Sequence, residues 1–279
     1  MSQPKPHEAT KPVKHHLTLL ISLVLAVAAS GLAASSAQAA DATPSPTASP
    51  TSKPSVTPIA IADPIGAIGS TDATDPVLCG VCFNPGAYSL SKANSLWVVA
   101  NKQRPLNPIT YKPTLGYFKG VALAKVAATA LTQMAAGMAK DKAGTLLLNS
   151  GYRSYDTQKI VHARQVSRLG LKAGEALAAR PGYSEHQTGL AADVSASGQG
   201  CVIQVCFAKT KAGKWLAANA WQYGFILRYP DGQTKVTGYQ FEPWHFRFVG
   251  VQLATEMKSQ NISVLEKFWQ LPAAPSYTY

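Results

Sequence analysis

The sequence predicts an α+β domain. Segments in which apolar residues follow helical spacing alternate with short apolar runs typical of strands and with turns. No repeat with a period of roughly 20 to 50 residues recurs, which excludes a solenoid. The 19 Pro and 21 Gly exclude one long coiled coil, and a hydrophobic share of 46% excludes a wholly disordered chain.

The first expected helix covers residues 117–140 and packs one apolar face on the core. That face consists of Leu123, Val126, Ala127, Ala130, Leu131, Met134 and Met138. A short buried strand is expected at 145–148. A second helix is expected at 157–169, ended by Gly170, a residue suited to the left-handed cap.

Three more strands and one more helix are expected in the second half of the chain. They are a strand at 189–194, a helix at 214–223 closed by Gly224, and strands at 225–229 and 244–249. His162 would lie on the surface of the second helix, and Trp244 would pack so that it orients its neighbour His245.

The N-terminus is expected to be an export signal. Lysines precede an apolar stretch at 17–32, and Ala37 and Ala39 form a small-residue cleavage site, so residues 1–39 would be removed. The alternative is an uncleaved membrane anchor, because the apolar run is close to the length of a thin membrane span. Both interpretations place the rest of the chain outside the cytoplasm, either secreted or associated with the cell envelope.

Residues 40–75 are expected to form an extended spacer. Thr, Ser, Pro and Ala dominate residues 41–58, and nothing there is large enough to build a core. The folded domain would then comprise residues 76–279, which is enough for one sizeable core.

The chain is basic, with 26 Lys and Arg against 14 Asp and Glu and a net charge of +12. Removal of residues 1–39 takes away three Lys and Glu8 and leaves +10. An exported basic protein is expected to meet acidic partners, such as anionic wall polymers, phospholipid head groups or carboxylate-bearing peptides. Nucleic acid is not expected, because of export and because no basic stripe interleaved with aromatic residues is present.

Four cysteines occur as two close pairs, Cys79 with Cys82 and Cys201 with Cys206. Export favours disulfides, for which three pairings are open. A structural zinc site with four thiolates is the alternative, disfavoured by export and by the unequal spacing of the pairs. A redox role for Cys79 and Cys82 is less favoured than the zinc site, because no strand-then-helix pattern surrounds this pair.

Two of the three histidines beyond residue 39 lie beside rare acids. Asp193 follows His186, and Glu242 precedes His245. Two imidazoles and a carboxylate form a common ligand set for catalytic zinc, and the remaining carboxylate is then free to act on the metal's water. Pro243 stiffens the chain between Glu242 and His245. Each histidine alone is compatible with an ordinary hydrogen-bonding role, but two such clusters favour a metal.

The pattern Ser-x-His-x-x-Gly-x-Ala-x-Asp at 184–193, followed by Glu-x-Trp-His at 242–245, resembles the LAS metallopeptidases, named for lysostaphin, D-Ala-D-Ala peptidases and sonic hedgehog. Within them it resembles the D-alanyl-D-alanine carboxypeptidases of the vancomycin-resistance type. Further matching segments lie at 96–102, 150–154 and 223–230. The resemblance implies a single catalytic domain with a small central antiparallel sheet and flanking helices.

The resemblance also implies roles for individual residues. His186, Asp193 and His245 would bind one Zn²⁺ ion, and Glu242 would be the general base that takes a proton from water and returns it to the leaving amine. Arg153 would face the developing oxyanion.

Three further residues would contact the substrate. Ser184 would bind it near its terminal carboxylate, and Gln158 and Tyr152 would be pocket residues. Glu185, beside a ligand, is not included in the expected metal set.

The resulting expectation is an exported zinc carboxypeptidase that removes the terminal D-Ala from peptidoglycan stem peptides. The alternatives within the family are an L,D-carboxypeptidase and an endopeptidase acting on the same peptides. A serine enzyme is a further alternative. Ser89-x-x-Lys92 fits the motif of penicillin-binding proteins, but no Lys-Thr-Gly follows it. Residues 182–186 resemble a nucleophile elbow, but His stands in place of the last Gly. The last alternative is a non-catalytic module that contains zinc and binds the cell wall.

Overall fold

The computed structural model of the protein describes residues 83–278. The expected export signal, the spacer, Cys79 and Cys82 therefore lie outside the described residues. Within the described residues, no helix is long and apolar enough to cross a membrane.

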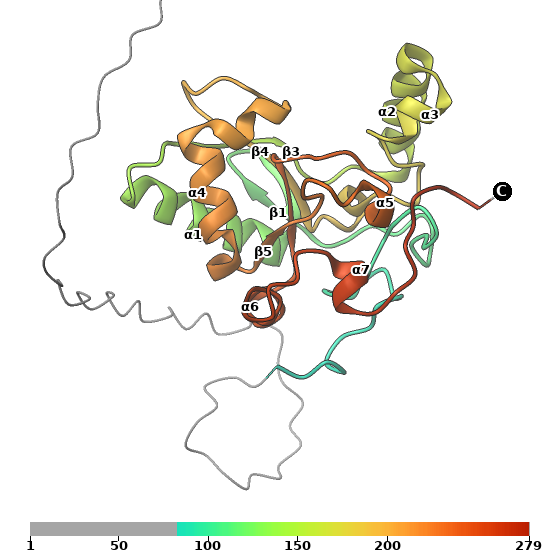
Figure 1. Ribbon diagram of the computed structural model, residues 1–279, viewed down its shortest axis with the longest axis horizontal. Coiled ribbons are helices and arrows are strands. Elements are labelled where there is room, and N and C mark those ends of the chain that lie inside the picture. The colour runs from blue at the N-terminus through green and yellow to red at the C-terminus, as the bar shows by residue number, and fades with distance from the viewer. Residues whose placement is uncertain (1–82, 279) are drawn as a thin grey trace, which may run out of the picture. The chain divides into compact units, whose positions relative to one another are not determined.

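A four-stranded antiparallel sheet lies at the centre of the domain, as the resemblance implied (Figure 1). Its order is β3 (Leu146–Ser150), β4 (Ala191–Ala196), β6 (His245–Phe248) and β5 (Phe225–Leu227). In the pairing of β4 with β6, Asp193 lies opposite His245. The sheet register thus brings together two side chains that are far apart in the sequence.

A separate two-stranded hairpin precedes the first helix. It consists of β1 (Leu115–Phe118) and β2 (Val121–Ala124), and helix α1 (Lys125–Lys140) follows at once. The predicted helix start at residue 117 is therefore wrong. Lys119 and Gly120 adopt positive φ values of 47° and 84°, which reverse the chain between the two strands. The apolar face from Val126 to Met138 was predicted correctly, because its residues are buried in the core or packed against it, whereas Leu123 enters the core from β2.

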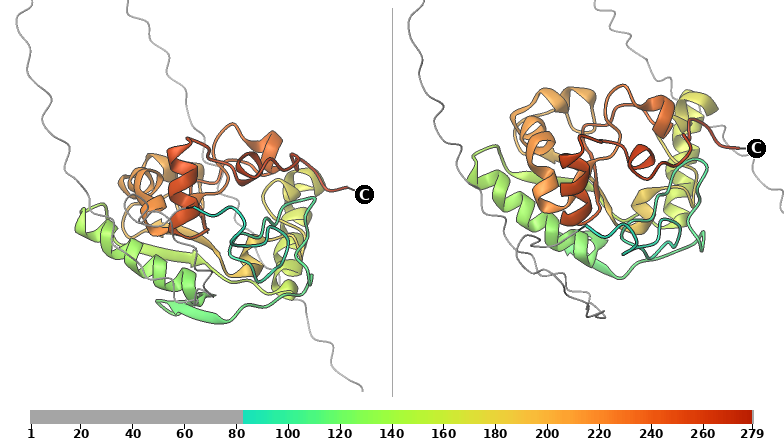
Figure 2. Two further views of the ribbon diagram at one scale, coloured as in Figure 1. Left: turned by 90° about the horizontal axis from the view of Figure 1, so that it is seen from below. Right: turned by 60° about the horizontal axis from the view of Figure 1, so that its bottom comes forward.

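The second helix, α2 (Tyr155–Leu169), begins at an N-cap, where the hydroxyl of Ser154 accepts a hydrogen bond from the backbone N–H of Thr157. It ends at Gly170, as predicted, with φ of 78°. The short α3 (Leu171–Glu175) turns back against it. In Figures 1 and 2, α2 and α3 lie on one side of the sheet, and α1 lies on the other.

The remaining helices follow in the second half of the chain. They are α4 (Lys211–Asn219), continued by a 3₁₀ helix at Ala220–Tyr223, then α5 (Thr234–Thr237), α6 (Val251–Ser259) and α7 (Leu265–Phe268), with further 3₁₀ helices at Glu185–Thr188 and Val205–Lys209. Gly224 closes the α4 segment in the left-handed conformation, as predicted.

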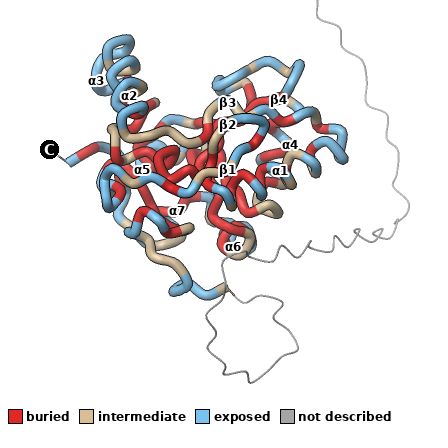
Figure 3. Tube along the Cα trace, turned by 180° about the vertical axis from the view of Figure 1, so that it is seen from behind, coloured by how far each residue is buried: buried red, intermediate tan, exposed pale blue. Residues whose placement is uncertain are grey.

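The main core lies between the sheet and helices α1 and α4, and buried positions concentrate there (Figure 3). A second apolar cluster joins the segment before β1 to α6 and α7 through Trp97, Val249, Leu253 and Leu265. The indole N–H of Trp97 donates to the carbonyl of Val249 at 2.9 Å. The segment from residue 83 onward therefore belongs to the same domain as the C-terminal helices.

We expect Gly189→Ala to destabilise the domain by about 2–4 kcal/mol. Gly189 has φ of 70°, and an added Cβ would lie 2.6 Å from the backbone nitrogen of Ala124. Gly200→Ala is the matched control, since Gly200 has φ of 64° but nothing lies within 4 Å of its Cβ position. Urea unfolding of both variants checks this, and equal losses would show that the close approach of β2 costs nothing.

Candidate active site

Three buried side chains from separate elements converge at the two central strands of the sheet, β4 and β6. His186 comes from the 3₁₀ helix that precedes β4, Asp193 from β4 and His245 from the start of β6. Asp193 Oδ2 lies 3.1 Å from His186 Nε2, and Asp193 Oδ1 lies 3.0 Å from His245 Nδ1. One potential ligand atom from each residue falls within a span of 4.8 Å. The structure therefore brings together the three predicted metal ligands.

The second ring nitrogen of each histidine is held by another group. His186 Nδ1 lies 2.7 Å from the carbonyl oxygen of Gly151, which can only accept, so this nitrogen carries a proton. His245 Nε2 lies 3.4 Å from Glu185 Oε2. Both rings are thus oriented to direct their remaining nitrogen toward Asp193, as metal-ligating histidines are.

Glu242 is a fourth buried ionisable group beside this cluster. Its Oε2 lies 3.7 Å from His245 Nδ1, and its backbone N–H donates to the carbonyl of Tyr229 at 3.1 Å. Burial raises the pKa of Glu242 to about 8, Asp193 adds to the increase, and His245 opposes it. A carboxyl group with a pKa near neutrality is suited to both accepting and returning a proton.

The two histidines differ in electrostatic setting. Burial lowers the pKa of His186, and the Arg153 guanidinium lowers it further. Burial also opposes protonation of His245, but its contacts with Asp193 and Glu185 outweigh this effect and raise its pKa to about 9. A metal must therefore displace a proton from His245, because histidine binds metals in its neutral form.

Arg153 extends from the loop after β3 toward the same cluster. Its Nη2 lies 3.8 Å from Asp193 Oδ2, and its backbone N–H donates to the carbonyl of His186 at 3.1 Å. Its Nε is buried and has no hydrogen-bond partner among the described residues. The guanidinium lines the cleft next to the cluster, where its positive charge can act on a group that enters the site.

These residues line one cleft with a volume of about 240 Å³. Of the predicted site residues, it contains Arg153, Gln158, Ser184, His186, Asp193, Glu242 and His245. Tyr152 is half-buried and is not among the lining residues, so its predicted contact with substrate has no support in the geometry.

Comparison with known proteins identifies the family. A family model described as VanY, D-alanyl-D-alanine carboxypeptidase, matches residues 120–251. YodJ of Bacillus subtilis (strain 168) is 36% identical over 194 residues, which are 66% of this chain and 70% of YodJ. The chain belongs to the VanY family of D-alanyl-D-alanine carboxypeptidases. As a VanY-family protein it is a hydrolytic enzyme, and the resemblance found in the sequence is confirmed.

Solved VanY-type structures confirm the fold. The LdcB LD-carboxypeptidase superposes with a TM-score of 0.59 at 36% identity, covering 64% of this chain and 87% of LdcB. A vancomycin-resistance D,D-pentapeptidase VanY in complex with Zn(II) superposes with a TM-score of 0.54 at 30% identity, covering 62% of this chain and 97% of that chain. VanYB in complex with D-alanine-D-alanine superposes with a TM-score of 0.55 at 30% identity, covering 62% of this chain and 96% of VanYB.

The VanY-family site of this chain fits zinc. Two imidazole nitrogens and a carboxylate suit the ion, and three protein ligands leave a position open for water. His186 Nε2 is buried without a hydrogen bond of acceptable geometry, although Asp193 Oδ2 is 3.1 Å away. An ion between these atoms would satisfy both.

Glu185 is the functional residue that the sequence-based prediction missed. It is fully buried, and its Oε1 accepts hydrogen bonds of 2.8 Å from Arg228 Nε and from Arg247 Nη1. Burial by itself would raise the pKa of Glu185, but the two guanidinium groups outweigh it and hold the pKa well below its usual range. Glu185 is thus a fixed anion behind His245, and not a metal ligand. The only feature of the sequence that points to Glu185 is its position as a rare acid next to the predicted ligand His186.

The other predicted residues near the site have the following environments. Gln158 is buried, its Nε2 donates to the carbonyl of Ala179 at 2.8 Å, and its Oε1 has no partner among the described residues. Trp244 packs in the main core and also lines the cleft. The prediction that His162 is a surface residue is wrong: it is half-buried, with Nε2 3.4 Å from Glu175 Oε1, because α3 folds back on α2.

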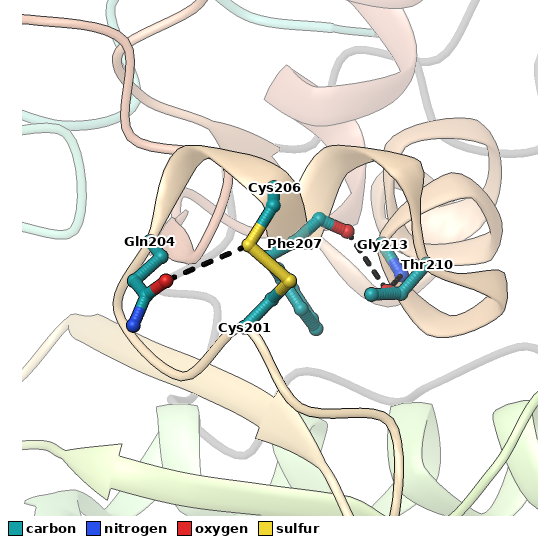
Figure 4. The surroundings of a disulfide bond; sticks show 6 residues. All are labelled: Cys201, Gln204, Cys206, Phe207, Thr210 and Gly213. Atoms are coloured by element: carbon teal, nitrogen blue, oxygen red, sulfur yellow. Dashed lines mark hydrogen bonds between the residues drawn. A yellow bond between two sulfur atoms is a disulfide. The ribbon is translucent and has the colours of Figure 1, made fainter. Parts of the chain in front are cut away.

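One predicted cysteine pair lies in the described part of the chain. Cys201 and Cys206 form a disulfide that closes a short loop between β4 and α4 (Figure 4). This pairing agrees with disulfides rather than a thiolate zinc site for these two residues.

Proposed function

We propose that this VanY-family enzyme is a zinc-dependent carboxypeptidase that removes the terminal D-Ala from peptidoglycan stem peptides outside the cytoplasm. The observation that carries the proposal is a three-ligand metal group with a separate buried acid, Glu242, in one cleft. The relatives solved with Zn(II) and with D-alanine-D-alanine support the same metal and the same substrate end.

The residues of this chain would divide the reaction among them. His186, Asp193 and His245 hold the zinc ion, which when bound supplies a Lewis acid and lowers the pKa of water. Glu242 accepts the proton of the attacking water and returns it to the leaving amine of D-Ala. Arg153, whose guanidinium lines the cleft beside Asp193, offsets the charge that develops on the carbonyl oxygen.

The hydroxyl of Ser184 would donate to the substrate's terminal carboxylate, and Gln158 would line the pocket beside it. Both side chains are buried and line the cleft.

The similarity to LdcB favours a second candidate, an L,D-carboxypeptidase that acts on tetrapeptides. A non-catalytic module is not favoured, since the metal group found in the described residues has three members and a structural zinc site has four protein ligands. The Ser89-x-x-Lys92 form of the serine alternative has no support, because Ser89 Oγ accepts from the backbone N–H groups of Ser91 and Lys92 and does not line the cleft.

Mass spectrometry of defined stem peptides tests the proposal. We expect loss of one D-Ala from the pentapeptide, abolition of this activity by a chelator, recovery with Zn²⁺, and no inhibition by a β-lactam. Preferential cleavage of the tetrapeptide would identify the L,D-carboxypeptidase instead. Activity that persists in chelator and is blocked by a β-lactam would exclude the zinc mechanism.

A further inference from the structure

Lys102 is a buried ammonium group that does not line the cleft and that no ion pair compensates. Its Nζ donates a hydrogen bond of 2.5 Å to the carbonyl oxygen of Gly238. Burial lowers the pKa of Lys102, and the charge of Glu175 opposes this, but Glu175 pairs with Arg180 at 2.6 Å and not with Lys102. Lysines are seldom buried without a paired acid, because removing an ammonium from water is costly. The contact with Gly238 therefore indicates a role beyond packing.

The backbone that carries Lys102 is fixed to the centre of the domain. The neighbouring Asn101 donates through Nδ2 to Glu266 Oε1 at 3.0 Å. Arg247, on β6, donates through Nη2 to the carbonyl of Val98 at 2.9 Å. Lys102 thus extends from a rigid support toward Gly238.

Gly238 ends α5 and begins the segment that leads to Glu242, four residues later (Figure 1). It has φ of 81°, and an added Cβ would lie 2.4 Å from the carbonyl oxygen of Ala274 and 2.8 Å from Cδ of Lys102. The C-terminal segment and the lysine stem therefore hold this glycine closely from two directions. Lys102 fixes the point at which the chain leaves α5 for Glu242.

A stack of aromatic rings joins the same ammonium to the wall of the cleft. Nζ of Lys102 lies 4.8 Å from the centre of the Tyr239 ring, a distance typical of a cation–π contact. The Tyr239 ring packs on the Tyr229 ring at 4.6 Å, and the carbonyl of Tyr229 accepts the backbone N–H of Glu242 at 3.1 Å. Both tyrosines line the cleft. The ammonium thus supports the Glu242 segment at Gly238 and again through the two rings.

We infer that Lys102 is a positioning residue for the reaction, which fixes the 238–242 segment and thereby the place of Glu242 in the cleft. The inference rests on the proposed function, because it needs Glu242 to act on the substrate's water. Lys102 itself touches none of the cleft-lining acids or histidines, and acts through Gly238 and Tyr239.

Lys102→Met tests this role, because methionine keeps an unbranched apolar stem and removes the ammonium. We expect kcat for D-Ala release from the pentapeptide to fall about 30-fold, with KM changed by less than about twofold, since a displaced base costs rate and not substrate binding. The zinc content should be unchanged, because Lys102 contacts none of the three metal-group residues.

Lys119→Met is the matched control. Lys119 makes the same two kinds of contact at the β1–β2 turn: its Nζ donates to the carbonyl of Leu146 at 3.2 Å and lies 5.4 Å from the centre of the Phe118 ring. It does not line the cleft. This variant should leave kcat and KM unchanged.

The double variant Lys102→Met/Glu242→Gln separates positioning of the base from a general effect on the fold. Once the base is removed, Lys102 has nothing to position, so the double variant and Glu242→Gln should have the same residual kcat. Losses of kcat that multiply, or an unchanged kcat in Lys102→Met, would overturn the inference.

Hydrogen exchange of the full chain, followed by mass spectrometry, tests the inference independently of the reaction. The backbone N–H groups of Gln240 and Glu242 donate to the carbonyls of Ala176 and Tyr229. In Lys102→Met these two groups should exchange about tenfold faster, with the β1–β2 hairpin unchanged, because the segment opens locally more often.

Faster exchange confined to residues 238–242 would support the inference even where the wild type releases no D-Ala, a result that would contradict only the proposed reaction. Unchanged exchange in this segment, or faster exchange throughout the domain, would assign Lys102 to stability alone and overturn the inference.

Discussion

Glu242→Gln is expected to lower kcat for D-Ala release by roughly 10³-fold while zinc stays bound. The carboxamide has nearly the same shape as the carboxylate but cannot take a proton from water. The three residues that form the metal group do not include Glu242, so the ligands themselves are unchanged. The measurements are kcat on the pentapeptide and the zinc content of the purified variant.

Glu256→Gln is the control for this substitution. It makes the same chemical change on α6, where Glu256 accepts a hydrogen bond from Gln260 and does not line the cleft. It should leave kcat unchanged. Undiminished D-Ala release by Glu242→Gln would exclude Glu242 as the base, and loss of zinc together with activity would instead place Glu242 among the ligands.

The metal group was predictable from sequence because its chemistry is local. His186 and Asp193 lie within one short motif, and Glu242 and His245 lie within another. Only the contact between the motifs needed the fold, and the pairing of β4 with β6 supplies it. Helical spacing likewise predicted α1, but not the turn at Lys119, because a positive φ in a lysine leaves no mark on the apolar pattern.

The environment of the ligands was not predictable, because its partners are remote in the chain. Glu185 contacts Arg228 and Arg247, which are 43 and 62 residues away. His162 was predicted on the surface because its partner, Glu175, comes from a different helix that packs back on α2. In each case the residue type was visible in the sequence, and the packing that gives it a partner was not.

The second large expected effect concerns Arg228, which lies next to β5 with its side chain fully buried. Its Nε donates to Glu185, and its two terminal nitrogens donate to the two carboxylate oxygens of Glu266 at 2.9 Å and 2.7 Å. Burial alone would raise the pKa of Glu266, but the Arg228 guanidinium outweighs it and lowers the pKa. Arg228→Met would leave Glu266 as an uncompensated buried charge, which is expected to cost about 3–5 kcal/mol of the free energy of unfolding.

The double variant Arg228→Met/Glu266→Gln tests this explanation, because it removes both charges together. Replacing a buried ion pair by neutral groups of similar size is often close to neutral, so most of the lost stability should return. Urea unfolding of the single and double variants gives the comparison. A double variant no more stable than Arg228→Met would mean that the loss comes from packing around the arginine and not from an unpaired carboxylate.

Arg228 also connects the fold to the metal centre, since Glu185 accepts from Arg228 through Oε1 and approaches His245 through Oε2. Groups that hold a metal-ligating histidine typically change metal affinity by about 10- to 100-fold when removed. Arg228→Met should therefore weaken zinc binding within this range, measured by competition with a chromogenic chelator. Arg104→Met is the control, because Arg104 donates to the carbonyls of Leu90 and Val99 and not to Glu185. Unchanged zinc affinity in Arg228→Met would show that Arg228 contributes to stability and not to zinc binding. It would also show that Arg247 alone is sufficient to hold Glu185 against His245.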